Sequence, residues 1–288
     1  MLVGGALAER ASRLVAAGEP VELLGPPRRF VGRGGEKLDA ALDRFALDVH
    51  GAVALDAGAS TGGFTDCLLR RGAAVVVAVD VGHGQLDARL RSDRRVVVLE
   101  RTHVKSLDPV LLAASIPASG AASIPASGAA SIPASGAASI PASGAASIPA
   151  SGAVSDASAG VAVDVVTADL SFISLASVVP VLAGPLVRAG GHLVLLVKPQ
   201  FEVGKREASR GRGVVREPEL WLGALRAVAS SLADAGAAIM DAMRSPITGA
   251  SGNTEFFLHA VAHAAPAGAA LPEEGEGMLR DALSTAPR

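Results

Sequence analysis

The chain has 288 residues, half of them hydrophobic, and its 26 Lys and Arg against 28 Asp and Glu give a formal net charge of −2. This size suffices for one α/β domain with a small appendage, and the charge excludes a global attraction to nucleic acid, so any RNA contact must come from a local basic patch. The single cysteine, Cys67, excludes an intrachain disulfide and suits a reducing cytoplasm, and the N-terminus lacks the pattern of an export signal.

The first 24 residues are too few to bury a core alone. Their turn and apolar pattern predicts three short β segments, at Leu2-Val3, Arg13-Leu14-Val15 and residues 21–24. Residues 25–32 then read as a proline-stiffened linker whose Phe30 is placed to dock on the neighbouring domain. Lys37 stands at the start of the following amphipathic helix, where the macrodipole disfavours a cation, so these residues alone favour a solvated lysine.

Residues 53–64 organise the rest of the chain. An apolar run predicts a buried parallel strand, glycines allow close backbone approach, and a helix opens at Phe64. A second apolar run ends at Asp80, where a dinucleotide-binding fold places its ribose-binding acid.

The ligand of this loop follows from its charge. The glycines do not match G-x-G-x-x-G, no lysine follows them, and Asp56 within the expected loop repels a phosphate but can pair with a cation. A cationic, nucleoside-bearing cofactor, S-adenosylmethionine, therefore fits better than a nucleotide phosphate. An ordinary βα turn is the alternative.

Buried strands at residues 96–99, 163–168 and 192–197 alternate with helices, which predicts a doubly wound parallel sheet. Ser174 is expected to cap a helix that begins at Leu175, and Gly190-Gly191 to turn the chain into the strand at 192–197. The octapeptide Ala-Ala-Ser-Ile-Pro-Ala-Ser-Gly occurs five times in tandem over residues 113–152. A proline and a glycine in every unit exclude a continuous helix, soluble or membrane-spanning, so we expect a surface loop.

The segment from Lys198 to Arg216 holds six basic residues against two acidic ones, and arginine alternating with glycine suits phosphate contacts. A solvated loop is the alternative. A helix over residues 218–235 and two strands, at 238–243 and 255–260, complete the expected sheet, with the last strand antiparallel. The acidic tail is expected to fray.

Four charged residues, Lys37, Asp169, Lys198 and Glu255, fall where this topology brings chain segments to the ligand-binding edge. Two lysines and two carboxylates form a neutral cluster in which each charge can be paired. Methyl transfer to a ribose hydroxyl needs such a site, because the hydroxyl is a poor nucleophile until a base takes its proton. A lysine serves as that base only where burial or a neighbouring cation lowers its pKa. No metal is required.

Five segments, at residues 33–38, 56–64, 168–174, 198–202 and 245–255, resemble the motifs of the TlyA family of FtsJ-like ribose methyltransferases. The resemblance implies a Rossmann-like class I methyltransferase fold: a seven-stranded, mostly parallel α/β sheet with helices on both faces. It assigns residues 33–265 to the methyltransferase domain, with the insert at 113–152, and leaves residues 266–288 as a flexible tail. It also implies 2′-O-methylation of cytidine in 16S ribosomal RNA, 23S ribosomal RNA or both.

The resemblance further implies functional residues. The catalytic tetrad would be Lys37, Asp169, Lys198 and Glu255. S-adenosylmethionine would lie against Asp56, Gly58, Ser60, Thr61, Gly62, Gly63, Phe64, Asp80, Val81, Glu100, Arg101 and Thr102. Ribosomal RNA or ribosomal subunits would contact Arg28, Arg29, Arg33, Lys205, Arg206, Arg210 and Arg212. Neither a metal nor a membrane would be a partner.

Members of the family begin with a complete RNA-binding module of the ribosomal protein S-four type, of which residues 1–24 resemble only the second half. Either the start is misassigned or RNA docking is weakened. A non-catalytic RNA-binding protein of the same fold is therefore one alternative function. A membrane-active haemolysin, after the label that family members often carry, and a small-molecule methyltransferase are two others.

Overall fold

The computed structural model describes residues 1–10, 12–22, 24, 28–116, 146–147, 162–204 and 213–284. Most of the octapeptide insert lies outside these residues, and so do four of the predicted RNA contacts, Lys205, Arg206, Arg210 and Arg212. What the sequence predicts for them stays a prediction.

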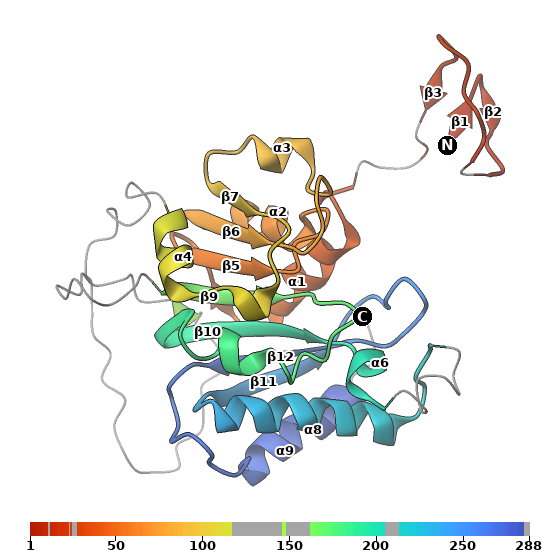
Figure 1. The fold of residues 1–288 in the computed structure, drawn as a ribbon. Coiled ribbons are helices and arrows are strands. Elements are labelled where there is room, and N and C mark those ends of the chain that lie inside the picture. The colour runs from red at the N-terminus through yellow and green to blue at the C-terminus, as the bar shows by residue number, and fades with distance from the viewer. Residues whose placement is uncertain are drawn as a thin grey trace.

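The main body is built on a seven-stranded sheet of order β11-β12-β10-β9-β5-β6-β7 (Figure 1). The strands are β5 (Val53–Ala57), β6 (Val75–Val79), β7 (Val96–Leu99), β9 (Val163–Ala168), β10 (Val187–Val197), β11 (Ala238–Arg244) and β12 (Phe256–Val261). Strands β7, β6, β5, β9 and β10 are parallel, and β12 runs antiparallel to both of its neighbours. The predicted seven-stranded, mostly parallel sheet is confirmed.

The sheet reverses its winding between β5 and β9. From β5 the chain proceeds outward through β6 to β7, then returns to place β9 on the other side of β5. Open α/β sheets bind ligands at the carboxyl ends of the strands beside such a switch point. The topology therefore directs attention to the residues that follow Ala57 and Ala168.

Helices cover both faces of the sheet, as predicted (Figure 1). They are α1 (Arg33–Arg44), α2 (Gly63–Arg70), α3 (Ala88–Arg91), α4 (Pro109–Ser115), α5 (Val179–Leu182), α6 (Pro199–Glu202), α8 (Pro218–Asp234) and α9 (Glu273–Ser284). Alternate residues of β5 enter two separate cores: Leu55 packs with residues of α8, and Ala54 packs with residues of α1 and α2. Strands buried on both faces explain why the sequence shows continuous apolar runs instead of alternation.

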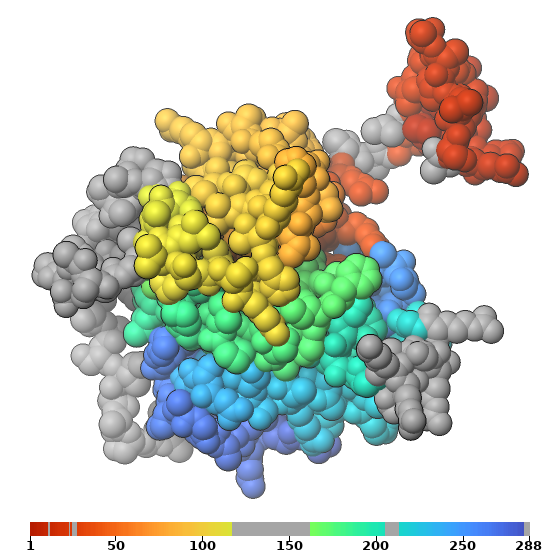
Figure 2. Space-filling model, in the orientation of Figure 1, coloured from red at the N-terminus to blue at the C-terminus, as the bar shows by residue number. Residues whose placement is uncertain are grey.

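A small antiparallel sheet precedes the main body and stands apart from it in Figures 1 and 2. Its strands are β1 (Leu2–Val3), β2 (Ala6–Leu7) and β3 (Val21–Glu22). The prediction of a strand at residues 13–15 is wrong, because the chain already turns at residues 4–5 and the second strand is Ala6–Leu7. Gly4 and Gly5 both adopt positive φ, which suits a tight hairpin and pairs Leu2 with Leu7.

Two expectations in the main body are wrong. Ser174 caps no helix, because its hydroxyl donates to Glu202 and α5 begins only at Val179. Gly190-Gly191 does not precede the fifth buried strand but lies inside β10, where the register against β9 shifts. Gly190 has φ +72, as glycines at strand irregularities often do.

The prediction of a flexible tail is wrong for residues 273–284, which form α9. This helix packs against α8 and β11, and it buries Leu279 and Ala282 completely or nearly so. An ion pair between Arg226 and Glu276 joins α8 to α9. The acidic first turn of α9 complements the helix macrodipole. The negative charge that suggested fraying therefore favours the start of this helix.

The insert enters the described structure at two places. Its first residues, 113–115, form the end of α4, and Ile116 is buried in the core, so the expected surface loop does not begin at residue 113. The two-residue strand β8 (Ala146–Ser147) pairs in parallel with β4 (Leu47–Asp48). No helix in the described ranges is both long and apolar enough to cross a membrane.

Candidate active site

The four predicted catalytic residues lie around one cavity of about 630 Å³. They form two ion pairs, Lys37 Nζ to Glu255 Oε2 at 2.5 Å and Lys198 Nζ to Asp169 Oδ1 at 2.6 Å. Exposed fractions of 6 % for Lys37, 9 % for Lys198 and 3 % for Glu255 show that the charges are largely withdrawn from water. Burial of this kind is tolerated because each charge has a partner.

The elements explain how the pairs meet. Asp169 follows β9 and Lys198 follows β10, and the carboxyl ends of neighbouring parallel strands share one edge of the sheet. Glu255 comes immediately before β12, whose antiparallel direction places its start at the same edge. Lys37 reaches this edge from α1. The solvated position that its local sequence favoured is wrong, because the carboxylate of Glu255 compensates for the unfavourable helix dipole.

Ser171 is a site residue that the sequence reasoning missed. Its hydroxyl accepts a hydrogen bond of 3.0 Å from Lys198 Nζ, so that Asp169 and Ser171 together hold the lysine. Its position two residues beyond Asp169, at the carboxyl end of a buried strand, is the signal that could have identified it.

Two phenylalanines lie at the same cavity. Phe172 is 93 % exposed and has φ +65, an unusual combination for a large apolar residue. Its ring lies 5.5 Å from that of Phe201, centroid to centroid, and Lys198 Nζ lies 6.0 Å from the Phe201 centroid. An exposed aromatic on strained backbone beside charged residues is typical of a ligand-binding surface.

A smaller cavity of about 170 Å³ adjoins the first. Five of the predicted cofactor residues line it: Gly58, Ser60, Thr61, Gly63 and Phe64. The two cavities share Arg33, Gly34, Asp169, Ser171 and Lys198 in their linings. The catalytic lysine of β10 thus stands where the glycine loop meets the larger cavity.

Glycine is required in this loop by the backbone itself. Gly58 has φ +86, and a Cβ there would lie 2.7 Å from the carbonyl oxygen of Asp169. Gly62 has φ +97, and a Cβ there would meet Leu90. The loop is therefore a cradle of backbone that any side chain would fill.

Asp56 lies inside β5 and not in the loop, so that part of the expectation is wrong. Its side chain is fully buried and accepts a 2.6 Å hydrogen bond from Thr65 Oγ1 at Oδ2, while Oδ1 has no hydrogen-bond partner among the described residues. Burial raises its pKa to about 7, an effect that the Thr65 hydrogen bond opposes and the charge of Asp169 reinforces. Asp56 lines neither cavity, but an unpartnered buried acceptor beneath the glycine cradle suits a cationic ligand.

The other predicted cofactor residues, Asp80, Val81, Glu100, Arg101 and Thr102, lie at the ends of β6 and β7 and line neither cavity. Asp80 connects to the loop by accepting from the backbone N–H groups of Ser60 at 2.8 Å and Gly82 at 2.6 Å. Glu100 forms an ion pair with Arg91. The hydrogen bond from Arg91, together with those from Gly84 and His83, lowers the pKa of Glu100 to about 2. Val81 is exposed beside Asp80.

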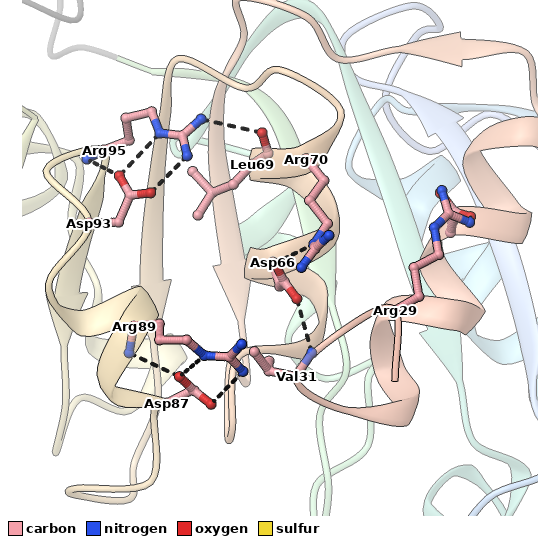
Figure 3. A network of polar contacts seen from close by, with 10 residues as sticks. Arg29, Val31, Asp66, Leu69, Arg70, Asp87, Arg89, Asp93 and Arg95 are labelled. Atoms are coloured by element: carbon pink, nitrogen blue, oxygen red, sulfur yellow. Dashed lines mark hydrogen bonds and ion pairs between the residues drawn. The ribbon is translucent and has the colours of Figure 1, made fainter. Parts of the chain in front are cut away.

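The end of the linker docks on α2, as Phe30 suggested. Phe30 is buried, and the N–H of Val31 donates a 2.9 Å hydrogen bond to Asp66, which also accepts from Arg70 (Figure 3). Arg29 pairs with Asp39, and Arg28 is exposed. Of the three predicted RNA contacts here, Arg33 alone lines the cavities.

Asn253 is a second residue that sequence reasoning missed. It is buried, its side-chain oxygen accepts from Val215 N–H at 2.9 Å, and its amide donates to the Gly213 carbonyl at 2.8 Å. It thereby ties the chain leaving the predicted basic loop to the segment that carries Glu255. Across the described ranges no cluster of three or more His, Cys, Asp or Glu side chains could hold a metal.

Residues 30–261 match the family model of the FtsJ-like methyltransferases. The chain belongs to this family. Within it, the chain is 43 % identical over 231 residues to the 16S/23S rRNA (cytidine-2′-O)-methyltransferase TlyA of Mycobacterium tuberculosis, covering 80 % of this chain and 68 % of that protein. It is 33 % identical to Hemolysin A of Brachyspira hyodysenteriae over 80 % of this chain and 76 % of that protein.

A solved structure shares the fold of this chain. A protein of Streptococcus thermophilus, named after haemolysins, superposes with a TM-score of 0.68 at 32 % identity, covering 93 % of this chain and 79 % of that one. The resemblance inferred from the motifs is confirmed, and so is the methyltransferase fold class.

Proposed function

We propose that this FtsJ-like methyltransferase transfers a methyl group from S-adenosylmethionine to the 2′-hydroxyl of a cytidine in ribosomal RNA. The observation that carries the proposal is the placement of Lys198 at the junction of the glycine cradle and a cavity lined by two buried ion pairs. The 43 % identity to a protein named for this reaction supports it.

The cofactor would be held by the Gly58–Phe64 loop, with the carboxylates of Asp56 and Asp80 beneath and beside it and Val81 and residues 100–102 on its flank. S-adenosylmethionine supplies a methyl group activated by a sulfonium. The backbone cradle at Gly58 and the unpartnered oxygen of Asp56 fit such a cationic ligand.

The protein's own groups would prepare the acceptor. In its free-amine form Lys198 takes the proton of the 2′-hydroxyl, and Asp169 and Ser171 hold its Nζ at the reacting position. The Lys37–Glu255 pair also lines the cavity and keeps a fixed dipole there. The exposed ring of Phe172 offers a flat surface for a base whose ribose lies in the cavity.

The RNA backbone would be held by basic residues around this opening. Arg33 lines both cavities and Arg28 and Arg29 precede it, while Lys205, Arg206, Arg210 and Arg212 belong to the loop predicted for phosphate contacts. A ribosomal substrate places the activity in the cytoplasm.

The test is transfer of labelled methyl from S-adenosylmethionine to purified small and large ribosomal subunits that lack the modification. Wild-type protein should label RNA at a cytidine that then resists alkaline cleavage, and Lys198→Ala should not. Lys105→Ala, an exposed lysine outside both cavities, is the matched control and should retain activity.

Two outcomes would contradict the proposal. Binding of cofactor and subunits without label would select the non-catalytic RNA-binding alternative. Leakage of liposomes that persists in Lys198→Ala, with no methyl transfer, would select the membrane-active one.

A further inference from the structure

Two loops carry the residues that meet at the larger cavity. The first, residues 169–176, follows β9 and contributes Asp169, Ser171 and Phe172. The second, residues 198–202, follows β10 and contributes Lys198 and Phe201. Any reaction at this cavity depends on how these loops are held relative to each other.

Two sets of contacts join the loops at the cavity. Lys198 Nζ contacts Asp169 at 2.6 Å and Ser171 at 3.0 Å, and further out the Phe172 and Phe201 rings lie 5.5 Å apart. These contacts involve the groups that a substrate would touch. A contact outside the cavity would hold the two loops together without involving those groups.

Glu202, the last residue of α6, joins the loops at their far end. Its Oε1 accepts from the N–H of Leu175 at 2.6 Å, and its Oε2 accepts from Ser174 Oγ at 2.7 Å and from the N–H of Ala176 at 3.4 Å. Three donors of one loop thus converge on a single carboxylate of the other. Hydrogen bonds to an ionised acceptor are among the stronger ones in proteins.

Strain in the first loop shows why this anchor is needed. Phe172 keeps φ +65 although its side chain is almost fully in solvent, so no packing of its ring into the core maintains that conformation. Strained backbone persists only where the flanking structure imposes it. Here Asp169 N–H bonds the Ala57 carbonyl at 3.0 Å on one side, and Glu202 holds residues 174–176 on the other.

We propose that Glu202 is a positioning residue for methyl transfer: its carboxylate locks the 169–176 loop to the 198–202 loop, and so fixes Ser171 against Lys198 and Phe172 over the cavity. The inference rests on the proposed function. Glu202 lines neither cavity and therefore acts through those two residues and not by contact with the reacting atoms.

The test compares Glu202→Ala with Glu202→Gln and with Glu219→Ala, an exposed glutamate of α8. The glutamine keeps an oxygen for Leu175 N–H, and its amide can donate to the Ser174 hydroxyl, but it loses the charge and the acceptor for Ala176 N–H, so its kcat should fall between those of wild-type and Glu202→Ala. Glu202→Ala should lower kcat for ribosomal RNA by about tenfold or more, since misplacement by about 1 Å costs that much. Its affinity for S-adenosylmethionine should fall less than kcat, because the Gly58–Phe64 loop is not touched although Asp169 and Ser171 also line the smaller cavity.

A double-variant cycle separates positioning from general damage. If Glu202 acts through Phe172, then Phe172→Ala combined with Glu202→Ala should be no slower than the slower single variant. The proposal would be overturned if the effects of Phe172→Ala and Glu202→Ala on kcat multiplied in the double variant. Full activity of Glu202→Ala would overturn it as well. So would a glutamine variant as slow as the alanine variant.

Backbone amide exchange gives a readout that does not depend on activity. Glu202→Ala should speed exchange of Leu175 and Ala176 while amides of β9 and β10 keep their protection. Unchanged exchange at Leu175, or loss of protection throughout the sheet, would overturn the proposal. If the wild-type protein transfers no methyl to RNA, the proposed function fails, and this measurement alone decides whether Glu202 locks the loops.

Discussion

Lys37 and Glu255 lie 218 residues apart in the chain and form a buried ion pair of 2.5 Å at the wall of the catalytic cavity. The pair closes the main body upon itself, because one partner precedes the first strand of the large sheet and the other precedes the last. Its energetic contribution depends on both charges being present.

Glu255→Ala should therefore destabilise the protein by roughly 3–5 kcal/mol, because it leaves a buried ammonium without a partner. Urea unfolding measures the loss. Combining it with Lys37→Met, which removes the orphaned charge, should restore most of the stability without restoring activity. A single alanine variant as stable as wild-type would contradict the expectation.

Gly58→Ala should abolish or strongly weaken binding of S-adenosylmethionine, because its Cβ would lie 2.7 Å from the Asp169 carbonyl oxygen at a φ of +86. Calorimetric titration with the cofactor is the measurement. Gly223→Ala provides the control, since a Cβ there meets nothing within 4 Å. In the middle of α8 it should leave cofactor affinity unchanged and raise stability by about 1 kcal/mol. Equal affinities in the two variants would argue against the cradle.

Asp56 should make stability fall as pH rises. Its pKa is about 7 in the folded protein against 3.8 for a free aspartate, so between these values the native state binds more protons than the unfolded state. Stabilisation by the protonated carboxyl is complete below pH 4 and is lost as pH rises to 7, with a total on the order of 4 kcal/mol.

Asp56→Asn, which cannot ionise, should remove this slope. Urea unfolding at pH 5 and pH 8 should show the variant gaining stability relative to wild-type at the higher pH. A constant difference between the two proteins would show that Asp56 does not titrate in this window.

Gln200 should contribute to substrate recognition. Its Oε1 is buried and has no hydrogen-bond partner within the described part of the chain, although the residue lines the larger cavity. An unmade hydrogen bond of this kind costs about 1–3 kcal/mol, which a donor on bound RNA, such as the amino group of cytosine, would recover. Gln200→Leu should lower kcat/KM for ribosomal RNA about tenfold or more. Gln200→Glu keeps the acceptor and should retain more activity; the reverse order would contradict this role.

The sequence predicts the catalytic edge well for a physical reason. Asp169 and Lys198 each follow an apolar strand, and parallel neighbours necessarily bring such ends together. Lys37 is different, because its local sequence favours solvent, and its place in the site rested on the expected topology and the family resemblance. Its partner comes from the other end of the chain, and no local pattern reports that contact.

The wrong secondary-structure predictions occur where a local sequence pattern is compatible with two structures. Ser174 has the chemistry of a helix cap, but its hydroxyl donates a hydrogen bond to the carboxylate of Glu202, 28 residues later. Gly190-Gly191 suits a turn or a strand bulge equally, and pairing with β9 and β12 decides for the bulge. In α9 the acidic composition obscured the apolar face that Leu279 and Ala282 present to the core.

The octapeptide array joins the sheet at the end remote from the chemistry. Apart from Ala146 and Ser147, residues 117–161 lie outside the described structure; the chain re-enters it at Ala162, just before the amino end of β9, whereas Asp169 follows its carboxyl end. A strand of that length separates the two points by about 20 Å. Changes in the number of octapeptide copies are therefore expected to leave methyl transfer unchanged.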